Sequence, residues 1–230
     1  MKRIGLIGGM SWQSTTIYYR LINLAVQARL GGHASADIVL RSLDFAPIEE
    51  LQRAGDWTGL DAMMAQAAQD VEAAGADLLL ICANTMHRCA DAVENAVDIP
   101  LLHIAEPLEI ALAELEIETV GLLGTRYVME QGFYRERLEE AGIEVMVPEE
   151  PDRSDVNRII YEELVAGRIE ESSRQRYREI MEQLAGDGAD AIALACTEIG
   201  LLIRPDDALV PILDTAVLHA QAAVDWALGE

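Results

Sequence analysis

Short apolar segments alternate along this chain with longer stretches in which apolar residues recur at helical spacing. The short segments are rich in Ile, Leu, Val and Ala, as buried strands are. They predict strands at residues 3–7, 38–42, 78–81, 101–104, 120–123, 144–147, 191–195 and 210–213. The longer stretches predict helices at residues 14–29, 57–74, 130–141, 156–166, 172–184 and 215–228.

This alternation predicts an α/β fold. Strands that are apolar along almost their whole length need cover on both faces, which is typical of mainly parallel sheets flanked by helices. The chain has 230 residues, enough for one large domain or two small ones with a sizeable buried core.

Two segments of the chain occur twice and in the same order: residues 4–10 resemble residues 120–126, and residues 74–80 resemble residues 187–193. Asp77 follows Gly5 by 72 residues, and Asp190 follows Gly121 by 69. Any strand followed by glycine looks similar, but two matches at nearly equal spacing favour a duplicated unit. We therefore expect two similar α/β lobes, formed by residues 1–105 with 208–230 and by residues 106–207.

Charge and composition exclude several classes of partner. The formal net charge of −23 repels phosphate backbones, so we expect no nucleic-acid partner. No apolar run has the roughly 18–20 residues that a membrane span needs, and the apolar run at the start is too short for a signal peptide. We therefore expect no membrane contact and a cytoplasmic location. The three cysteines are few and odd in number, so in an intracellular protein we expect free thiols and no disulfide framework.

Each copy of the second repeated segment ends in a thiol and small polar groups. Cys82 precedes Asn84 and Thr85 in the first half, and Cys196 precedes Thr197 and Glu198 in the second. In open parallel sheets, ligands bind outside the carboxyl ends of the strands. Either cysteine alone would be read as a small buried apolar residue. Two thiols at corresponding strand ends favour a functional site.

Two thiols on opposite sides of a carbon atom suit racemisation. A thiolate can remove a proton from one face, and a thiol can deliver one to the other. The common alternative, pyridoxal phosphate, requires a lysine for its Schiff base, and Lys2 at the start of the first strand is the only lysine. We therefore expect no cofactor and no metal.

The chain resembles the aspartate/glutamate racemase family over essentially its full length. The residues that carry the resemblance are Gly8–Trp12, Tyr18–Asn23, Asn84–His87, Leu123–Tyr127 and Cys196–Leu202. The resemblance implies two lobes related by a pseudo-twofold axis, a homodimer, and a two-base mechanism without PLP on an acidic amino acid in the cleft between the lobes. It also implies that Cys196 is catalytic and that the cleft is lined by Met10, Gln52, Asn84, Thr85, Thr125, Thr197 and Glu198.

The sequence departs from the family at the first catalytic position. The family's first cysteine directly precedes the Asn-Thr pair, where this chain has Ala83, and Cys82 lies one residue earlier. The internal repeat agrees, because Ala83 and Cys196 each lie six residues after the shared aspartate. A shift of one residue turns a strand side chain to the other face. Three outcomes are open: Cys82 reaches the cleft and is catalytic, Cys196 acts with water or another group, or the enzyme has moved to a related reaction.

A second departure concerns the substrate. Some relatives have a lysine suited to a carboxylate where this chain has Asp155, which disfavours an anionic side chain. Arg53 or Arg126 is a candidate to compensate, since guanidinium groups bind carboxylates bidentately. The nearest enzyme alternatives are a maleate isomerase and a hydantoin racemase, and the alternative from another class is a catalytically silent ligand-binding protein.

Weaker motifs favour structural roles. Gly5, Gly8 and Gly9 lack the pattern of a nucleotide site, so we expect them to let a substrate approach the backbone. Cys82, His87 and Cys89 do not have the spacing of a zinc site. We expect His87 to orient the Asn-Thr turn, and His33, His103 and His219 to be structural.

Overall fold

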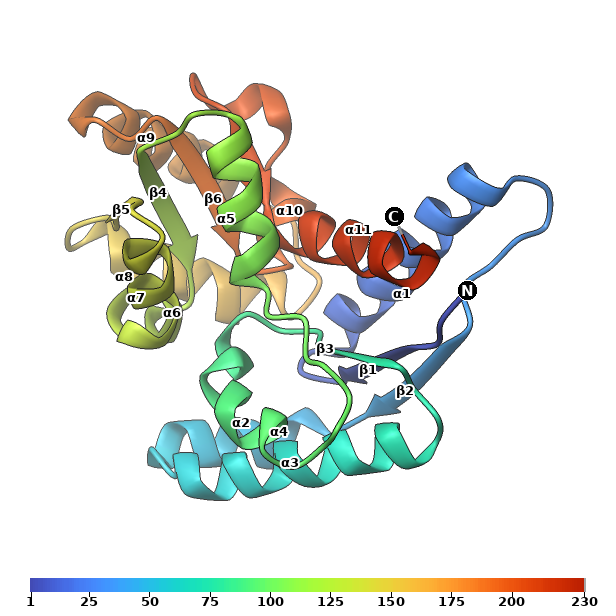
Figure 1. Ribbon diagram of the computed structural model, residues 1–230. Coiled ribbons are helices and arrows are strands. Elements are labelled where there is room, and N and C mark those ends of the chain that lie inside the picture. Colours follow the sequence, from blue (N-terminus) through green and yellow to red (C-terminus); the bar gives the residue numbers. More distant parts are fainter. Residues whose placement is uncertain (230) are drawn as a thin grey trace. The chain divides into compact units, whose positions relative to one another are not determined.

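The computed structural model describes residues 1–229, which form two compact units (Figure 1). The first unit comprises Met1–Ile104 and the residues from His219 onward, and the second comprises Ala105–Leu218. Each is an α/β unit with its own parallel sheet flanked by helices. We expected residues 208–230 to join the first lobe. In the structure residues 208–218 belong to the second unit, because the strand at residues 212–214 pairs within its sheet.

The first unit is built on a three-stranded parallel sheet of order β2-β1-β3. Helix α3 packs on one face of this sheet, and α1 and the end of α11 lie on the other (Figure 1). The elements are β1 (Ile4–Gly8), α1 (Trp12–Leu30), β2 (Ile38–Ser42), α2 (Phe45–Ala54), α3 (Trp57–Ala73), β3 (Leu78–Ile81), η1 (Thr85–Cys89), α4 (Ala90–Glu94) and the C-terminal part of α11 (Thr215–Leu228).

The second unit has a four-stranded parallel sheet of order β5-β4-β6-β7. Side chains of α8, η2 and α9 form its largest apolar cluster. Its elements are α5 (Ala105–Glu114), β4 (Thr119–Gly124), α6 (Arg126–Glu130), α7 (Gly132–Glu140), β5 (Glu144–Met146), α8 (Asp152–Ile159), η2 (Ile160–Leu164), α9 (Glu171–Asp187), β6 (Ala191–Ala195), α10 (Ile199–Leu202), η3 (Pro205–Asp207) and β7 (Ile212–Asp214).

One hydrogen-bond pattern occurs at the start of both sheets. The Asp77 carboxylate accepts from the Arg3 amide at 2.7 Å, and the Asp77 amide donates to the Arg3 carbonyl at 2.8 Å. The Asp190 carboxylate and amide make the same two bonds to Thr119, at 3.2 and 2.9 Å. Pairing then begins one residue later in each sheet, at Ile4↔Leu78 and Val120↔Ala191. The structure thus confirms the duplicated unit and fixes the same register in both copies.

The predicted strand at residues 101–104 is reduced to a single bridge between Leu79 and Leu101. Two backbone groups that a longer strand would pair are bound by side chains instead. The Leu102 carbonyl bonds the ring of His219 at 2.9 Å, and the Ile104 amide donates to the ring of His87 at 3.2 Å. Imidazole rings therefore hold this segment where a neighbouring strand would otherwise be needed.

Several short helices were not predicted, among them α4, α6 and α10, and neither were two helices of ten residues, α2 and α5. Each has a proline, Pro47 or Pro107, as its third residue. Proline is a helix breaker in the interior, but the amides of the first turn have no partner within the helix, so proline is tolerated there. The predicted helix at 130–141 is α7, which begins at Gly132, and the one at 156–166 is the end of α8 followed by the π-helical turn η2.

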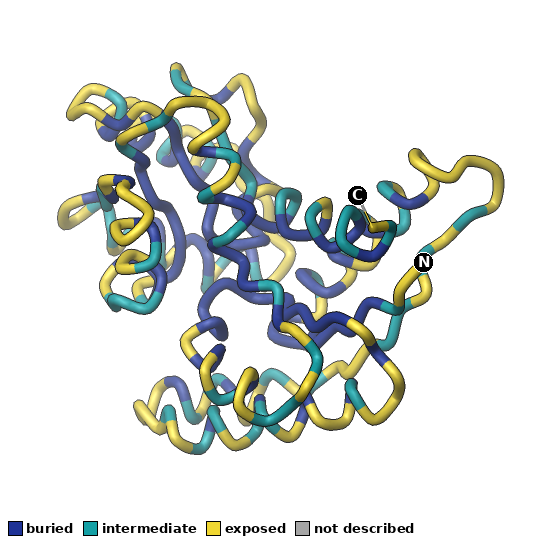
Figure 2. Tube along the Cα trace, in the orientation of Figure 1, coloured by how far each residue is buried: buried dark blue, intermediate teal, exposed yellow. Residues whose placement is uncertain are grey.

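The central strands β1, β3, β4 and β6 are buried almost throughout, whereas β2 at the edge of its sheet is partly exposed, and the outward faces of the helices are exposed (Figure 2). Three large apolar side chains of α1, Trp12, Tyr19 and Leu30, are among the exposed residues. Within residues 1–229, no helix combines the length and apolar character needed to cross a membrane.

A buried ion-pair network closes the segment after α10. The Asp207 side chain is fully buried and accepts from Arg174 at 2.8 and 2.9 Å and from Arg178 at 2.6 Å. It also accepts from the Arg204 amide at 2.8 Å. Burial alone would raise the pKa of Asp207, but the bonds from Arg174, Arg204 and Arg178 lower it to about 2. The carboxylate therefore ties η3 to α9.

We predict that Asp207→Asn lowers the free energy of unfolding at pH 7 by about 3 kcal/mol, because two arginines lose a buried charge partner. The lowered pKa contributes stability above roughly pH 4, and this contribution is lost as the pH falls toward 2. The difference from the parent protein should therefore shrink across that interval in urea unfolding curves. The exposed neighbour Asp206 provides the control, since Asp206→Asn should change stability by less than about 0.5 kcal/mol. Equal effects of the two substitutions would contradict the assignment.

Candidate functional site

In the first unit, β1 and β3 end side by side at the carboxyl edge of the sheet. Ile7 pairs with Ile81, and the Cys82 amide continues the ladder by donating to the Ile7 carbonyl at 2.9 Å. Beyond this point the chain turns away at Met10 after β1 and at Ala83 after β3. The predicted site residues Met10, Asn84 and Thr85 therefore all follow the ends of these two paired strands, and all three are buried.

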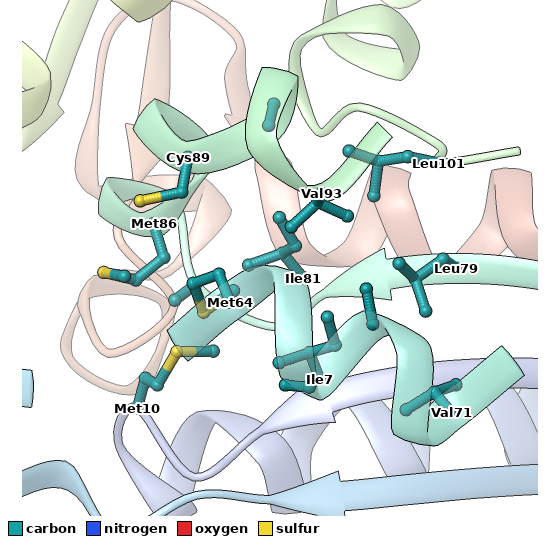
Figure 3. Close-up of a cluster of buried hydrophobic side chains, with 14 of the residues drawn as sticks. Ile7, Met10, Met64, Val71, Leu79, Ile81, Met86, Cys89, Val93 and Leu101 are labelled. Atoms are coloured by element: carbon teal, nitrogen blue, oxygen red, sulfur yellow. The ribbon is translucent and has the colours of Figure 1, made fainter. Parts of the chain in front are cut away.

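Sulfur-containing side chains gather below this edge. Met10, Met64, Met86 and Cys89, here called the methionine cluster, lie close together in one apolar core that also includes Ala83 (Figure 3). Buried Gln52 of α2 donates from Nε2 to the Met86 sulfur at 3.2 Å. Through this bond the structure brings Gln52 to Met86, which directly follows the predicted site residues Asn84 and Thr85. The cluster contains no cationic side chain.

The glycines after β1 serve packing of the chain itself. A Cβ atom at Gly8 would overlap the side chain of Thr15, and one at Gly9 would overlap the Leu43 backbone. Gly9 also has a φ of +92°, which L-residues rarely adopt. A side chain is therefore excluded at both positions by the packing of Thr15 and Leu43, and the approach of a substrate to this backbone stays a prediction.

In the second unit, β4 and β6 end at the same edge, with Gly124 paired to Ala195. Thr125 and Cys196 are the next residues of the two strands, and Thr197 and Glu198 follow Cys196. All four predicted site residues are buried. The structure therefore brings Thr125, Cys196, Thr197 and Glu198 together at one strand-end edge.

Cys196 has a specific partner at this edge. Its Sγ donates to Glu198 Oε2 at 3.3 Å, and its side chain sits beside that of a buried carboxylate. Burial, and then the charge of Glu198, raise the pKa of the Cys196 thiol well above its usual value. The thiol and the carboxylate are thus within hydrogen-bonding distance, as proton transfer between them would require.

The two copies of the repeat can be compared atom for atom at the strand ends. Because the registers match, Cys82 corresponds to Ala195 and Ala83 corresponds to Cys196. Cys82 and Ala195 are both 0% exposed, whereas Ala83 and Cys196 are 8% and 7% exposed. Burial alone raises the pKa of the Cys82 thiol. The side chain that matches the Cys196 position is therefore a methyl group, and Cys82 matches the fully buried Ala195.

The cations next to the predicted site residues already have acidic partners. Arg126, which follows Thr125, binds Glu130 at 2.8 Å and also binds Glu150. Arg53, which follows Gln52, binds Glu49 at 2.6 Å. Asp155, at the position where some relatives have lysine, binds Arg176 at 2.9 Å.

The sequence predicts that His87 orients the Asn-Thr turn and that His103 and His219 are separate structural residues, but the structure groups the three rings. The centroid of the His87 ring lies 4.6 Å from that of His103 and 5.7 Å from that of His219. The three come from segments far apart in the sequence, so no spacing pattern could have revealed the group. Both nitrogens of His87 lie on backbone groups, Ala83 O at 2.9 Å and Ile104 N at 3.2 Å, so His87 has no nitrogen for a zinc site with Cys82 and Cys89.

Comparison with known proteins places this geometry in a family. Residues 7–223 match the family Asp/Glu/Hydantoin racemase. A Yersinia pestis protein named as a candidate Asp/Glu racemase is 52% identical, with a TM-score of 0.93 over 99% of this chain and 100% of that one. An aspartate racemase homologue from Pyrococcus horikoshii is 31% identical, with a TM-score of 0.84 over 99% and 100% of the two chains.

A characterised relative is more distant in sequence. The broad specificity amino-acid racemase of Bacillus subtilis is 23% identical over 231 residues, which cover 98% of each chain. Together with the matched strand-end residues, these similarities support amino-acid racemase activity. The chain belongs to the Asp/Glu/hydantoin racemase family.

Proposed function

We propose that this protein is a cofactor-independent amino-acid racemase that exchanges the α-proton of its substrate through the Cys196 thiol. The observation that carries the proposal is the hydrogen bond from Cys196 Sγ to Glu198 Oε2 at the end of β6. A thiol that can pass its proton to a carboxylate can serve as both acid and base. The only lysine, Lys2, supports the absence of PLP, since its Nζ lies over the ring of Trp226, 4.0 Å from the centroid.

The protonation of the pair sets the order of events. Because the pKa of Cys196 is raised, the resting thiol is protonated at neutral pH. To act as a base, Cys196 gives its proton to the Glu198 carboxylate, and the resulting thiolate removes the α-proton of the substrate. This step leaves a neutral thiol, a protonated Glu198 and a substrate carbanion. The amide and hydroxyl groups of Asn84, Thr85, Thr125 and Thr197 are proposed to bind the substrate carboxylate and stabilise that charge.

Position 83 determines how the carbanion regains a proton. The repeat matches Ala83 to Cys196, and a methyl group has no proton to donate. We propose that Cys196 returns a proton to its own face of the carbon and that water supplies the opposite face. Cys82 is not the second base in this proposal, because its side chain is fully buried. Exchange of the α-proton should then be faster than inversion.

The first test follows a single amino-acid enantiomer in heavy water. We expect deuterium at the α-carbon of the recovered starting enantiomer before the opposite enantiomer accumulates, as measured by NMR and chiral chromatography. Cys196→Ala should reduce exchange by about 10²–10⁴-fold, because it removes the group that takes the α-proton directly from the substrate. The buried Cys82 thiol, which has no role in this proposal, supplies the matched control, and Cys82→Ala should retain exchange.

Exchange that survives Cys196→Ala would overturn the assignment of the base. Absence of exchange with every amino acid would favour the silent ligand-binding protein, which Ala83 makes a specific alternative. Maleate and a hydantoin belong in the same assay, since turnover of either without amino-acid exchange would identify a related isomerase.

We further propose that the substrate side chain is neutral. An incoming carboxylate would compete with Glu130 and Glu150 for Arg126, or with Glu49 for Arg53. Met10, which the family resemblance places at the substrate, belongs to the buried methionine cluster, so the surface that it would present to a substrate is apolar and adaptable. The broad specificity of the Bacillus subtilis relative is consistent with a surface of this kind.

A pair of isosteric substrates tests this proposal. Asparagine and glutamine should be exchanged with a kcat/KM about tenfold higher than aspartate and glutamate, corresponding to about 1.4 kcal/mol for one uncompensated charge. Glu150→Gln should narrow the difference by releasing one partner of Arg126, whereas Glu139→Gln, at the Arg135 pair, should leave it unchanged. A preference for the acidic substrates in the parent protein would refute the neutral side chain and leave the racemase proposal intact.

The shared cleft between the two halves, the homodimer and the cytoplasmic location stay predictions. The exposed apolar side chains Trp12, Tyr19 and Leu30 of α1 support a dimer, because large apolar residues on one helix favour burial against a partner.

A further inference from the structure

The segment after β3 is held by a buried imidazole. The His87 ring lies between two backbone groups: Nδ1 is 2.9 Å from the Ala83 carbonyl, and Nε2 accepts from the Ile104 amide at 3.2 Å. The His87 amide also donates to the Asn84 carbonyl at 3.1 Å. One residue therefore fixes both ends of the turn that presents Ala83, Asn84 and Thr85.

These contacts specify the tautomer of His87. A backbone amide can only donate, so Nε2 must carry a lone pair toward Ile104. The proton of the neutral ring is then on Nδ1, where it is donated to the Ala83 carbonyl. An imidazolium would place a second N–H against the Ile104 amide, so only the neutral ring satisfies both groups.

A second imidazole holds the same segment with the opposite tautomer. His219 Nε2 lies 2.9 Å from the Leu102 carbonyl, so Nε2 is protonated, and Nδ1 accepts from the Tyr18 hydroxyl at 2.7 Å. Burial lowers the pKa of His219 to about 4. The ring of His103 lies against that of His87. His219 thus supports residues 102–104, but it does not contact the Ala83 turn itself.

The second copy of the repeat has no imidazole at the position of His87. Counting from the shared aspartates, His87 corresponds to Gly200, and the strand registers match His103 to Asp214. A Cβ atom at Gly200 would overlap the Asp214 carboxylate, so no side chain fits there. The carbonyl of Cys196 instead accepts from the Ile199 amide at 3.0 Å. The imidazole is therefore specific to the copy that has lost the thiol.

We infer that His87 is a positioning residue: its neutral, Nδ1-protonated ring fixes the Ala83 carbonyl and thereby the orientation of Asn84 and Thr85 toward the substrate. The inference rests on the proposed function, because orientation matters only if these side chains bind the reacting amino acid. If His87 positions these side chains, its loss should lower kcat by more than the accompanying loss of stability explains.

Three substitutions separate positioning from packing. Asparagine places its amide nitrogen where Nδ1 lies and can still donate to the Ala83 carbonyl, whereas glutamine reaches the Nε2 position and alanine keeps neither contact. We expect His87→Asn to retain exchange within about threefold of the parent, and His87→Gln and His87→Ala to lower kcat by tenfold or more. His219→Gln serves as the control: it should lower Tm without a comparable loss of kcat.

A purely structural role predicts that kcat is unchanged in all folded variants, or falls only in proportion to Tm, and either result would overturn the inference. The tautomer gives a test that needs no activity and no variant. Nitrogen-15 NMR of histidine-labelled parent protein should show Nδ1–H for His87 and Nε2–H for His219. An Nε2–H or imidazolium form of His87 at neutral pH would refute the inference, while failure of all amino-acid exchange would refute only the proposed function.

Discussion

The register of two strand pairs is the constraint on which the site depends. Asp77 binds Arg3, the residue before β1, and Asp190 binds Thr119, the first residue of β4, each through both carboxylate and amide, so that pairing starts at the same place in both sheets. A parallel ladder then carries that register to the carboxyl edge without slippage. The aspartate that sets this register lies six residues before position 83 or 196. At about 3.3 Å per residue, it acts from the opposite end of the strand, more than about 10 Å from the side chain at the carboxyl edge.

This constraint also explains why two similar strand ends differ in chemistry. Cys196 emerges beside Glu198 and can exchange a proton with it. Cys82 precedes the equivalent position and remains inside, where burial keeps its thiol protonated. The strand end of the first copy carries the neutral side chains of Asn84 and Thr85 and the methyl group of Ala83. The imidazole of His87 binds the backbone there. The proposed chemistry is therefore asymmetric, with one reactive thiol and one supporting turn.

Much of this arrangement could be predicted from the sequence, because it depends on local pattern and on the repeat. Strand positions followed from apolar runs, and the match of Ala83 to Cys196 followed from counting residues after Asp77 and Asp190. What could not be predicted depends on contacts between distant segments. The ion pairs of Arg174 with Asp207 and of Arg126 with Glu150, and the grouping of three histidines, all join residues whose separation in sequence carries no signal. Helices α2 and α5 were missed for a local reason, the proline in each first turn.

The register makes the central claim testable by moving a thiol one residue. Ala83→Cys, in a protein where Cys82 is replaced by alanine, places sulfur at the position that matches Cys196. The ratio of inversion to α-deuterium exchange measures whether that sulfur meets the substrate carbon. The account predicts that Cys82→Ala alone leaves the ratio unchanged and that adding Ala83→Cys raises it. A ratio that falls with Cys82→Ala and does not respond to Ala83→Cys would show that Cys82, not position 83, faces the chemistry.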